Sequence, residues 1–266
     1  MGEHVVRTAE GTDRSHLEAA LARNEFVLFY QPKVDLRDGR VVGAEALIRW
    51  QHPERGLLSP ASFLPIVDRA DLAAVFGRWV LANALAQAAE WRRLGLDMPV
   101  SVNVATSHLC AATFVEDVRT ALVAFPELGP GALELEVKEA AAGDDVAGLG
   151  GIIDACRPLG VRFAIDNFGT GQASVADVRD LRVDTIKIDQ SFVRNLLDDA
   201  NDQSMVEAII GLARAFRRQV VAEGIEAAAH CVALINLGCP VGQGFGIARP
   251  MPAEELAHWL ARRPGS

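Results

Sequence analysis

The order of hydrophobic segments constrains the fold of this chain more than any other feature of its sequence. From Ser15 onward, short apolar runs alternate with longer, alanine-rich segments in which apolar residues recur with helical spacing. The runs that fit buried strands are Phe26–Val34, Val41–Trp50, Val100–Val104, Ala132–Val137, Val161–Ile165, Thr185–Ile188 and Val220–Ala222. The segments that fit helices are His16–Arg23, Ser62–Val67, Asp71–Leu94, Val115–Val123, Val146–Leu159, Val175–Asp180, Met205–Phe216, Ala227–Leu237 and Glu254–Ala261. Strands that alternate with helices are typical of an α/β fold with a parallel sheet.

The connections between the runs predict the strand directions. Only Leu36-Arg37-Asp38-Gly39 separates the first two runs, and Asp-Gly is a hairpin signal, so these two strands are expected to be antiparallel. A helical segment follows each later strand, which favours parallel crossovers. No linker rich in glycine, serine or proline interrupts the chain after residue 15. We therefore expect a polar tail or linker remnant at 1–15 and one domain over 16–264, a length typical of a single barrel.

Composition excludes several classes of protein. A net charge of −9 and a pI near 5.2 argue against a basic face that binds DNA or RNA polymers. The most apolar long segment, Asp71–Leu94, carries Arg78 and Glu90, so we interpret it as a buried helix and not as a membrane span. The four cysteines have no CxxC spacing and are expected to be free, buried thiols. This predicts a reducing compartment and a cytoplasmic location.

Polar residues end five successive strand runs. These residues are Asn103, Glu136, Asp166, Lys187 and Glu223. A single polar strand end is commonly a solvated end or a helix cap, but the ends of parallel barrel strands converge on the face that carries active sites. Glu45 lies within the second run between two alanines, which leave room around its carboxylate. We therefore expect four carboxylates in one cleft.

Four ionised carboxylates need compensation if they lie close together. Each pair at ~4 Å costs about 4 kcal/mol at an effective dielectric of 20. Raised pKa values or bound divalent cations relieve this repulsion. Oxygen ligands, with Asn103 and Gln243 adding neutral ones, favour Mg²⁺ or Mn²⁺ over Zn²⁺. Two roles stay open for Lys187, a charge-balancing ion pair or the orientation of a water or phosphate oxygen.

Two glycine-rich segments, Gly169–Gly171 and Gly242–Gly246, resemble phosphate loops only loosely, and no Walker A sequence is present. We interpret both as tight loops at strand ends.

Seven blocks in order carry a resemblance to a known family. They are AEALIRWQHPERGLLSP at 44–60, SVNVA at 101–105, LELEV at 133–137, IDNFGTG at 165–171, VDTIKIDQSFV at 183–193, VVAEGIE at 220–226 and GQGFGIARPMP at 242–252. Over roughly 17–260 the chain resembles the EAL-domain family of cyclic di-GMP phosphodiesterases. The resemblance implies a TIM-type (β/α)8 barrel with one antiparallel strand near the N-terminus, which agrees with the hairpin expected at Asp38-Gly39.

The resemblance also implies roles for individual residues. The metal-ligand positions are Glu45, Asn103, Glu136, Asp166, Asn167 and Glu223, for one or two ions of Mg²⁺ or Mn²⁺. Glu223 matches the general base, and Lys187 matches the amine that holds the attacking water. The substrate-binding positions are Gln31, Leu47, Arg49, Gln243 and Pro250, with Gln243 reached through water and Pro250 in a block that frames a guanine. Glu139 matches the residue that anchors the loop after Asp166.

Three departures from the family pattern keep the function open. Asn167 replaces the second of two consecutive aspartates, Lys138 replaces a threonine, and Gln172-Ala173-Ser174 replaces Tyr-Ser-Ser. Asn167 offers a carbonyl oxygen but no charge, so a second cation is expected to bind more weakly and activity to fall.

The leading hypothesis is a metal-dependent phosphodiesterase that hydrolyses cyclic di-GMP to the linear dinucleotide pGpG in bacterial second-messenger signalling. The alternatives are a catalytically weak or inactive cyclic di-GMP receptor and a protein-interaction module without ligand. The resemblance also suggests a homodimer and a place within a larger signalling protein.

Overall fold

The computed structural model describes residues 13–69, 71–139, 141, 146–171 and 174–262. Its strands are β1 (Phe26–Asp35), β2 (Val41–His52), β3 (Gly56–Leu58), β4 (Val100–Asn103), β5 (Leu133–Lys138), β6 (Arg162–Phe168), β7 (Thr185–Ile188), β8 (Gln219–Ala222) and β9 (Val241–Gly242). The sheet has the order β1-β9-β8-β7-β6-β5-β4-β2-β3, and an additional β1–β2 pairing closes it into a barrel. Strand β3 pairs only with β2 and lies outside the closed ring.

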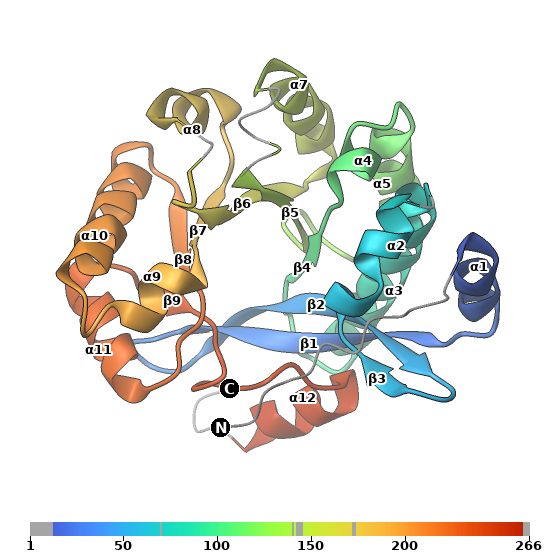
Figure 1. Ribbon diagram of the computed structural model, residues 1–266, viewed down its shortest axis with the longest axis horizontal. Helices are drawn as coiled ribbons and strands as arrows, with labels where there is room; N and C mark the ends of the chain where they lie inside the picture. Colours follow the sequence, from blue (N-terminus) through green and yellow to red (C-terminus); the bar gives the residue numbers. More distant parts are fainter. Residues whose placement is uncertain (1–12, 70, 140, 142–145, 172–173, 263–266) are drawn as a thin grey trace.

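Helices surround the barrel (Figure 1). They are α1 (Arg14–Ala22), α2 (Leu64–Arg69), α3 (Ala73–Arg93), α4 (Thr106–Leu109), α5 (Phe114–Val123), α7 (Val146–Cys156), α8 (Val175–Leu181), α9 (Gln190–Asn195), α10 (Ala200–Ala215), α11 (Ala228–Leu237) and α12 (Ala253–Ala261), with 3-10 turns at Pro60–Ser62 and Arg157–Leu159. The predicted α/β barrel is therefore confirmed.

Strand β1 runs against both of its neighbours. It is antiparallel to β2 and to β9, whereas β2 pairs in parallel with β4 and all pairs from β4 to β9 are parallel. The predicted antiparallel strand near the N-terminus is thus β1, joined to β2 through the Asp38-Gly39 turn, where Gly39 has φ +77°. Because β1 is reversed, it enters the barrel at the face where the other strands end, and it ends at the opposite face.

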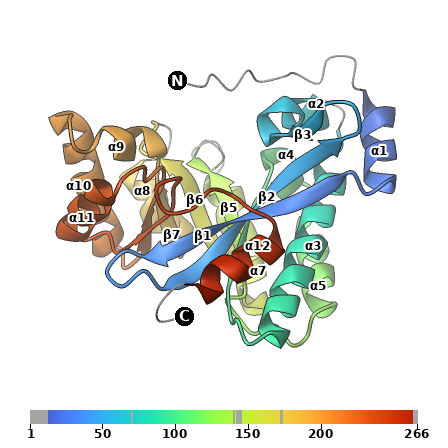
Figure 2. The same cartoon turned by 90° about the horizontal axis from the view of Figure 1, so that it is seen from below.

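Two hydrophobic cores stabilise the molecule. The larger core joins the barrel strands to the helices around them. The smaller core lies where the β1–β2 hairpin extends past the barrel toward α1 and α2 (Figure 2). There the Phe26 ring centroid lies 4.9 to 5.3 Å from the ring centroids of Trp50, Phe63 and Phe76, and the Trp50 and Phe63 centroids lie 5.9 Å apart. Both cores are apolar, so the polar side chains of the barrel strands point into the interior of the barrel and not into these cores.

Some elements were not expected from the sequence. Strand β9 has two residues, one of them glycine, and lies where we expected only a tight loop. Helices α4 and α9 are single short turns without a long apolar period. Helix α10 begins at Ala200, five residues before the expected start, because Asp199 caps a polar first turn through the backbone N–H groups of Asn201 and Asp202.

Other expectations have mixed outcomes. All four cysteines are free thiols, but Cys110 is exposed and Cys231 half-buried, so only Cys156 and Cys239 are buried as expected. Among the described residues, no helix is both long and apolar enough to cross a membrane. The predicted tail lies almost wholly outside the described residues, and α1 begins at Arg14 after the Asp13 cap.

The loop after β9 provides a test of the packing. A Cβ atom at Gly244 would press against the backbone of Ile225, whereas one at Gly211 on α10 would meet nothing within 4 Å. We expect Gly244→Ala to lower the free energy of unfolding by about 1–3 kcal/mol. The control Gly211→Ala should raise it by about 1 kcal/mol, because alanine favours a helix over glycine. Urea denaturation measures both changes, and equal stabilities for Gly244→Ala and the unchanged protein would contradict the proposed close packing.

Candidate active site

The polar strand ends predicted from the sequence meet at one end of the barrel. Glu45 lies on β2, while Asn103, Glu136, Asp166 and Lys187 lie on β4 to β7, one on each strand. Glu223 follows β8 and Gln243 follows β9. The parallel register pairs Asn103 with Glu136, and strand alternation turns these side chains into the barrel. We call Glu45, Glu136, Asp166, Glu223 and Lys187 the carboxylate cluster.

Lys187 is the centre of the carboxylate cluster. Its side chain is buried, and Nζ lies 2.6 Å from Glu136 Oε2, 2.8 Å from Glu223 Oε1, 3.1 Å from Asp166 Oδ1 and 3.4 Å from Glu45 Oε2. Of the two roles that the sequence left open, the ion pair is the one visible in this geometry. Lys187 keeps four carboxylates within reach of one positive charge.

Two amides complete the hydrogen bonds of Glu45. Asn103 Nδ2 donates to Glu45 Oε1 at 2.7 Å, and Gln243 Nε2 donates to Glu45 Oε2 at 2.5 Å and to Glu223 Oε1 at 2.9 Å. Gln243 therefore contacts two cluster carboxylates directly, where the resemblance implied a contact through water. Its own Oε1 is buried without a partner among the described residues.

Burial and charge shift the pKa values of the cluster in opposite directions. Burial, reinforced by Glu136, raises the pKa of Glu45, and burial raises the pKa of Glu223 to about 8 against the attraction of Lys187. Burial would also raise the pKa of Glu136, but its two lysine partners outweigh it and lower that pKa. The pKa of Lys187 stays well above its usual value because the carboxylates overcome the cost of its burial. The cluster is thus a site of excess negative charge.

The site contains a second lysine, Lys33, which was not predicted from the sequence. The sequence analysis selected one lysine, Lys187, for this site, but Lys33 Nζ on β1 lies 2.8 Å from Glu136 Oε1 and 2.7 Å from Glu134 Oε1. The signal was available in the strand alternation, because Gln31, Lys33 and Asp35 follow one another at every second position and so share a face. Glu134 and Glu136 share a face of β5 in the same way.

The donor set fits a divalent cation in charge and in ligand type. Glu45, Glu134, Glu136, Asp166 and Glu223 share two lysines, which leaves a formal excess of three negative charges. Asp166 Oδ1 is buried and lacks an aligned hydrogen-bond donor, although it forms an ion pair with Lys187. In the described part of the chain, no three His, Cys, Asp or Glu side chains are grouped around one ion position. Lys187 occupies the space between the carboxylates, so a cation would have to share the cluster with it.

A cleft of about 210 Å³ opens beside the cluster. Its walls include the predicted site residues Gln31, Glu45, Leu47, Asp166, Glu223 and Gln243. They also include five residues that sequence reasoning did not select, Gln190, Arg194, Gly224, Glu226 and Phe245, together with Gly244. Phe245 is exposed and stacks under the Arg249 guanidinium at 4.5 Å. Gln190 and Arg194 lie on the short helix α9, and the other four lie in the loops after β8 and β9, so none of them belongs to a long periodic segment.

Two predicted substrate residues lie away from the wall of this cleft. Arg49 lies on the same face of β2 as Glu45 and Leu47, and its Nη1 donates to the carbonyl oxygen of Ile48 at 2.9 Å. Its guanidinium lies 5.8 Å from the centre of the Phe29 ring. Pro250 is half-buried in the segment before α12. Neither residue lines the cleft as it stands.

The loop after Asp166 is tied to the end of β5. The buried Glu139 accepts hydrogen bonds through Oε2 from Thr170 N, Thr170 Oγ1 and Gly171 N, at 3.0 to 3.2 Å. Asn167 has φ +57°, a left-handed conformation that Asn and Asp adopt more readily than most residues, and the sheet register shifts around it. The departures at residues 172 and 173 lie outside the described residues.

Comparison with known proteins places this geometry in a family. The family model described as "EAL domain" matches residues 14–250. The chain is 40% identical over 247 residues to a cyclic di-GMP phosphodiesterase of Pseudomonas aeruginosa, and 36% identical over 249 residues to the cyclic di-GMP phosphodiesterase PdeR of Escherichia coli. These matches cover 92% and 93% of this chain but only 42% and 37% of the relatives.

Solved structures agree with the sequence matches. The PaMucR phosphodiesterase, solved as a c-di-GMP complex, has a TM-score of 0.87 and 40% identity, with 91% of this chain and 98% of that chain covered. The FimX EAL domain of Pseudomonas aeruginosa, bound to c-di-GMP, has a TM-score of 0.81 and 26% identity, with 88% and 94% covered. The range matched by the family model, 14–250, includes all strands of the barrel and the positions of the carboxylate cluster. This chain belongs to the EAL domain family.

Proposed function

We propose that the chain is a metal-dependent phosphodiesterase that hydrolyses cyclic di-GMP to pGpG. The observation that carries the proposal is the convergence of four carboxylates, three buried and one partly exposed, with Lys187 beside an open cleft at the carboxyl ends of the barrel strands. Relatives named as cyclic di-GMP phosphodiesterases, and a related structure titled as a c-di-GMP complex, support this substrate. The chain spans about two fifths of those curated relatives, so the proposal concerns this domain.

The proposed cation-binding residues are Glu45, Asn103, Glu136, Asp166, Asn167 and Glu223. A divalent cation, Mg²⁺ or Mn²⁺ in this proposal, would stabilise negative charge on the phosphate and promote ionisation of the attacking water. In this proposal Glu223 would accept a proton from that water. Lys187, 2.8 Å from Glu223, would hold the water by donating a hydrogen bond once a cation relieves part of the carboxylate attraction.

The proposed substrate contacts follow from the cleft. Gln31 and Leu47 form part of its wall, so both would contact the dinucleotide. Gln31 Nε2 already donates to the carbonyl oxygen of Ala248 at 2.9 Å, which fixes its side chain and brings the segment before Pro250 close to the cleft. Arg49 would leave the Ile48 carbonyl to pair with a phosphate, a geometry that guanidinium groups favour.

A non-catalytic receptor for cyclic di-GMP is the second candidate. Asn167 and Lys138 favour it, because both replace residues of the family pattern beside Asp166, and Lys138 is the register partner of Asp166. A protein-interaction module is the third candidate, and the retained carboxylate cluster speaks against it. Turnover of cyclic di-GMP with Mg²⁺ or Mn²⁺ would select the enzyme. Binding without turnover would select the receptor, and the absence of both binding and turnover would select the interaction module.

The remaining parts of the proposal concern context. A cytoplasmic location, a homodimer and membership of a larger signalling protein stay predictions. The free thiols are consistent with a reducing compartment.

The first prediction concerns the carboxylate cluster. Glu45→Gln and Asp166→Asn keep the side-chain volumes but remove charge that would hold the cation. We expect turnover to fall by about a hundredfold or more, because residues that only support a ligand already cost about 10- to 100-fold when they are replaced. Glu207→Gln on the exposed face of α10 is the charge-matched control and should keep full turnover. Turnover at the unchanged rate in either cluster variant would exclude the proposed cation site. Circular dichroism melts verify that each variant is folded.

The second prediction concerns the substrate. Arg49→Ala should weaken cyclic di-GMP binding by about 1.5–3 kcal/mol, the range for a hydrogen bond to a charged group. Arg119→Ala on α5, which removes an exposed arginine paired with Glu116, should leave the affinity unchanged. Calorimetric titration of the three proteins decides the matter. If Arg49→Ala and the unchanged protein have equal dissociation constants for cyclic di-GMP, Arg49 does not contact the substrate.

The third prediction concerns position 167. Asn167→Asp adds a carboxylate next to Asp166 without strain, because aspartate also adopts the left-handed conformation. We expect the concentration of Mg²⁺ or Mn²⁺ at half-maximal rate to fall. Asn201→Asp, at the exposed start of α10, adds the same charge far from the cluster and serves as the control. Superimposable metal titrations of Asn167→Asp and the unchanged protein would show that position 167 does not govern the cation.

A further inference from the structure

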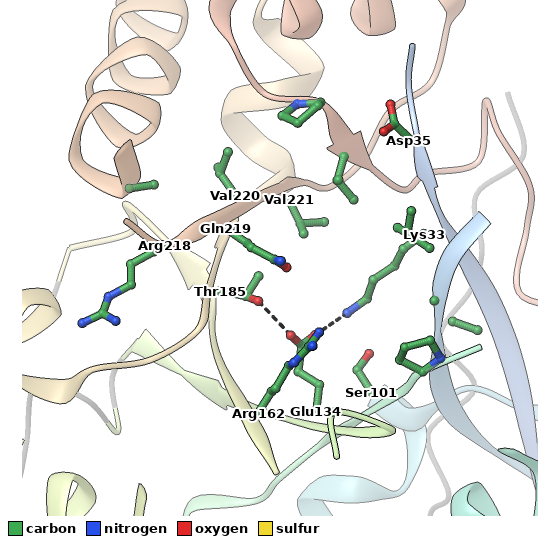
Figure 3. A pocket seen from close by; sticks show the side chains of 18 of the residues that line it. Lys33, Asp35, Ser101, Glu134, Arg162, Thr185, Arg218, Gln219, Val220 and Val221 are labelled. Atoms are coloured by element: carbon green, nitrogen blue, oxygen red, sulfur yellow. Dashed lines mark hydrogen bonds and ion pairs between the residues drawn. The ribbon is translucent and has the colours of Figure 1, made fainter. Parts of the chain in front are cut away.

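A larger cavity opens at the opposite end of the barrel, where the parallel strands begin (Figure 3). Its volume is about 480 Å³, against about 210 Å³ for the cleft beside the carboxylate cluster. The first residues of β4, β6, β7 and β8 line it, together with the end of the reversed strand β1. This volume falls within the range of small-molecule binding sites.

The cavity has a charge opposite to that of the whole chain. Its basic lining residues are Lys33, Arg40, Arg162, Arg214 and Arg218, and its acidic ones are Asp35 and Glu134. Five positive charges thus face two negative ones, although the chain carries a net charge of −9. A local excess of this sign attracts anions.

The side chains of two of these arginines form neither a hydrogen bond nor an ion pair in the described part of the chain, although the charge of Asp184 acts on Arg218. They are Arg162 and Arg218, and Arg218 Nε is buried without an acceptor. In Figure 3, Arg162 reaches toward the centre of the cavity, beside Glu134, and Arg218 lies at its edge. Guanidinium groups without a hydrogen-bond partner are free to bind an oxyanion through two hydrogen bonds each.

A buried hydroxyl adds a third unused donor. Ser101, on β4, is 2% exposed and its Oγ has no hydrogen-bond partner among the described residues. Figure 3 shows this oxygen directed into the cavity. A buried hydroxyl without a partner is unfavourable in the free protein, so a ligand that accepts its hydrogen bond would gain that free energy.

The neighbouring residues do not cancel the positive charge. Glu134, which lies beside Arg162 in Figure 3, already accepts hydrogen bonds from Lys33 at 2.7 Å and from Thr185 at 2.8 Å. Burial and the charges of Arg157 and Arg182 lower the pKa of Arg218, and Asp184 opposes them. The apolar walls from Val42, Ala44 and Val220 leave room for an uncharged part of a ligand.

We propose that this cavity is a second binding site, which takes a small molecule bearing phosphate groups. Arg162 and Arg218 hold the phosphate oxygens, and Ser101 Oγ donates a further hydrogen bond. The site lies at the far end of the barrel from the carboxylate cluster, so its ligand does not compete with a ligand in the cleft.

Inorganic pyrophosphate is the probe, titrated by calorimetry into the full chain without divalent cations. Under these conditions the carboxylate cluster repels anions, and only the basic cavity is expected to bind. Arg162→Gln and Arg218→Gln should each weaken binding about tenfold or more, as the loss of a charge-assisted contact does. Arg217→Gln, an adjacent arginine outside the lining, and Arg49→Ala, at the other end of the barrel, should leave it unchanged.

Ser101→Ala separates a binding role from a structural one. Because Ser101 Oγ has no partner in the free protein, the variant should be at least as stable in a thermal melt and yet bind pyrophosphate more weakly. The proposal is overturned if pyrophosphate does not bind, or if it binds equally well to Arg162→Gln, Arg218→Gln and the unchanged protein. It is also overturned if Arg49→Ala abolishes binding, since the anion would then lie in the cleft.

Discussion

The burial of one ammonium among four carboxylates governs the candidate site. Lys187 is inaccessible to solvent, and its partners are no more than partly exposed, so none of these charges is well hydrated. Removing one partner of such a network leaves an uncompensated buried charge, which costs several kcal/mol. Replacement of the whole network by apolar residues would avoid that cost, so the cluster is poorly explained by stability alone. Its excess of negative charge agrees with the proposed binding of a divalent cation.

The barrel makes this arrangement possible through strand register. Residues from five separate strands reach one cluster because each strand turns alternate side chains inward and all parallel strands end at the same face. The same alternation places the apolar residues between the sheet and the helices, where they form the core. A one-residue shift of any of these strands would turn its charged side chain toward that apolar core. The geometry of the carboxylate cluster and the packing of the fold are therefore set by one pattern.

This common pattern explains which features the sequence reveals. Strands with several successive apolar residues, such as β6, and the Asp38-Gly39 hairpin follow from local periodicity and turn chemistry. The carboxylate cluster follows from the polar residues that end these strands. Strand β9 does not follow, because two residues held by pairing with β1 and β8 have no period of their own. Lys33 was not predicted because the search for polar residues at strand ends does not include a charged residue within a strand. Phe245 was not predicted because the conformation of its loop depends on tertiary packing.

The reversed direction of β1 gives the barrel interior its polar continuity. The parallel strands place their last residues at the cleft, but β1 runs from the cleft, where Gln31 lies, to the opposite cavity, where Asp35 lies. Lys33, between them, binds Glu136 of the cluster and Glu134 of the far cavity. If β1 were parallel to the other strands, the residues after Lys33 would lie nearer to the cleft and not farther from it. Strand β1 supplies one lysine that both ends of the barrel share, and the charges at each end are balanced in part by the same ammonium.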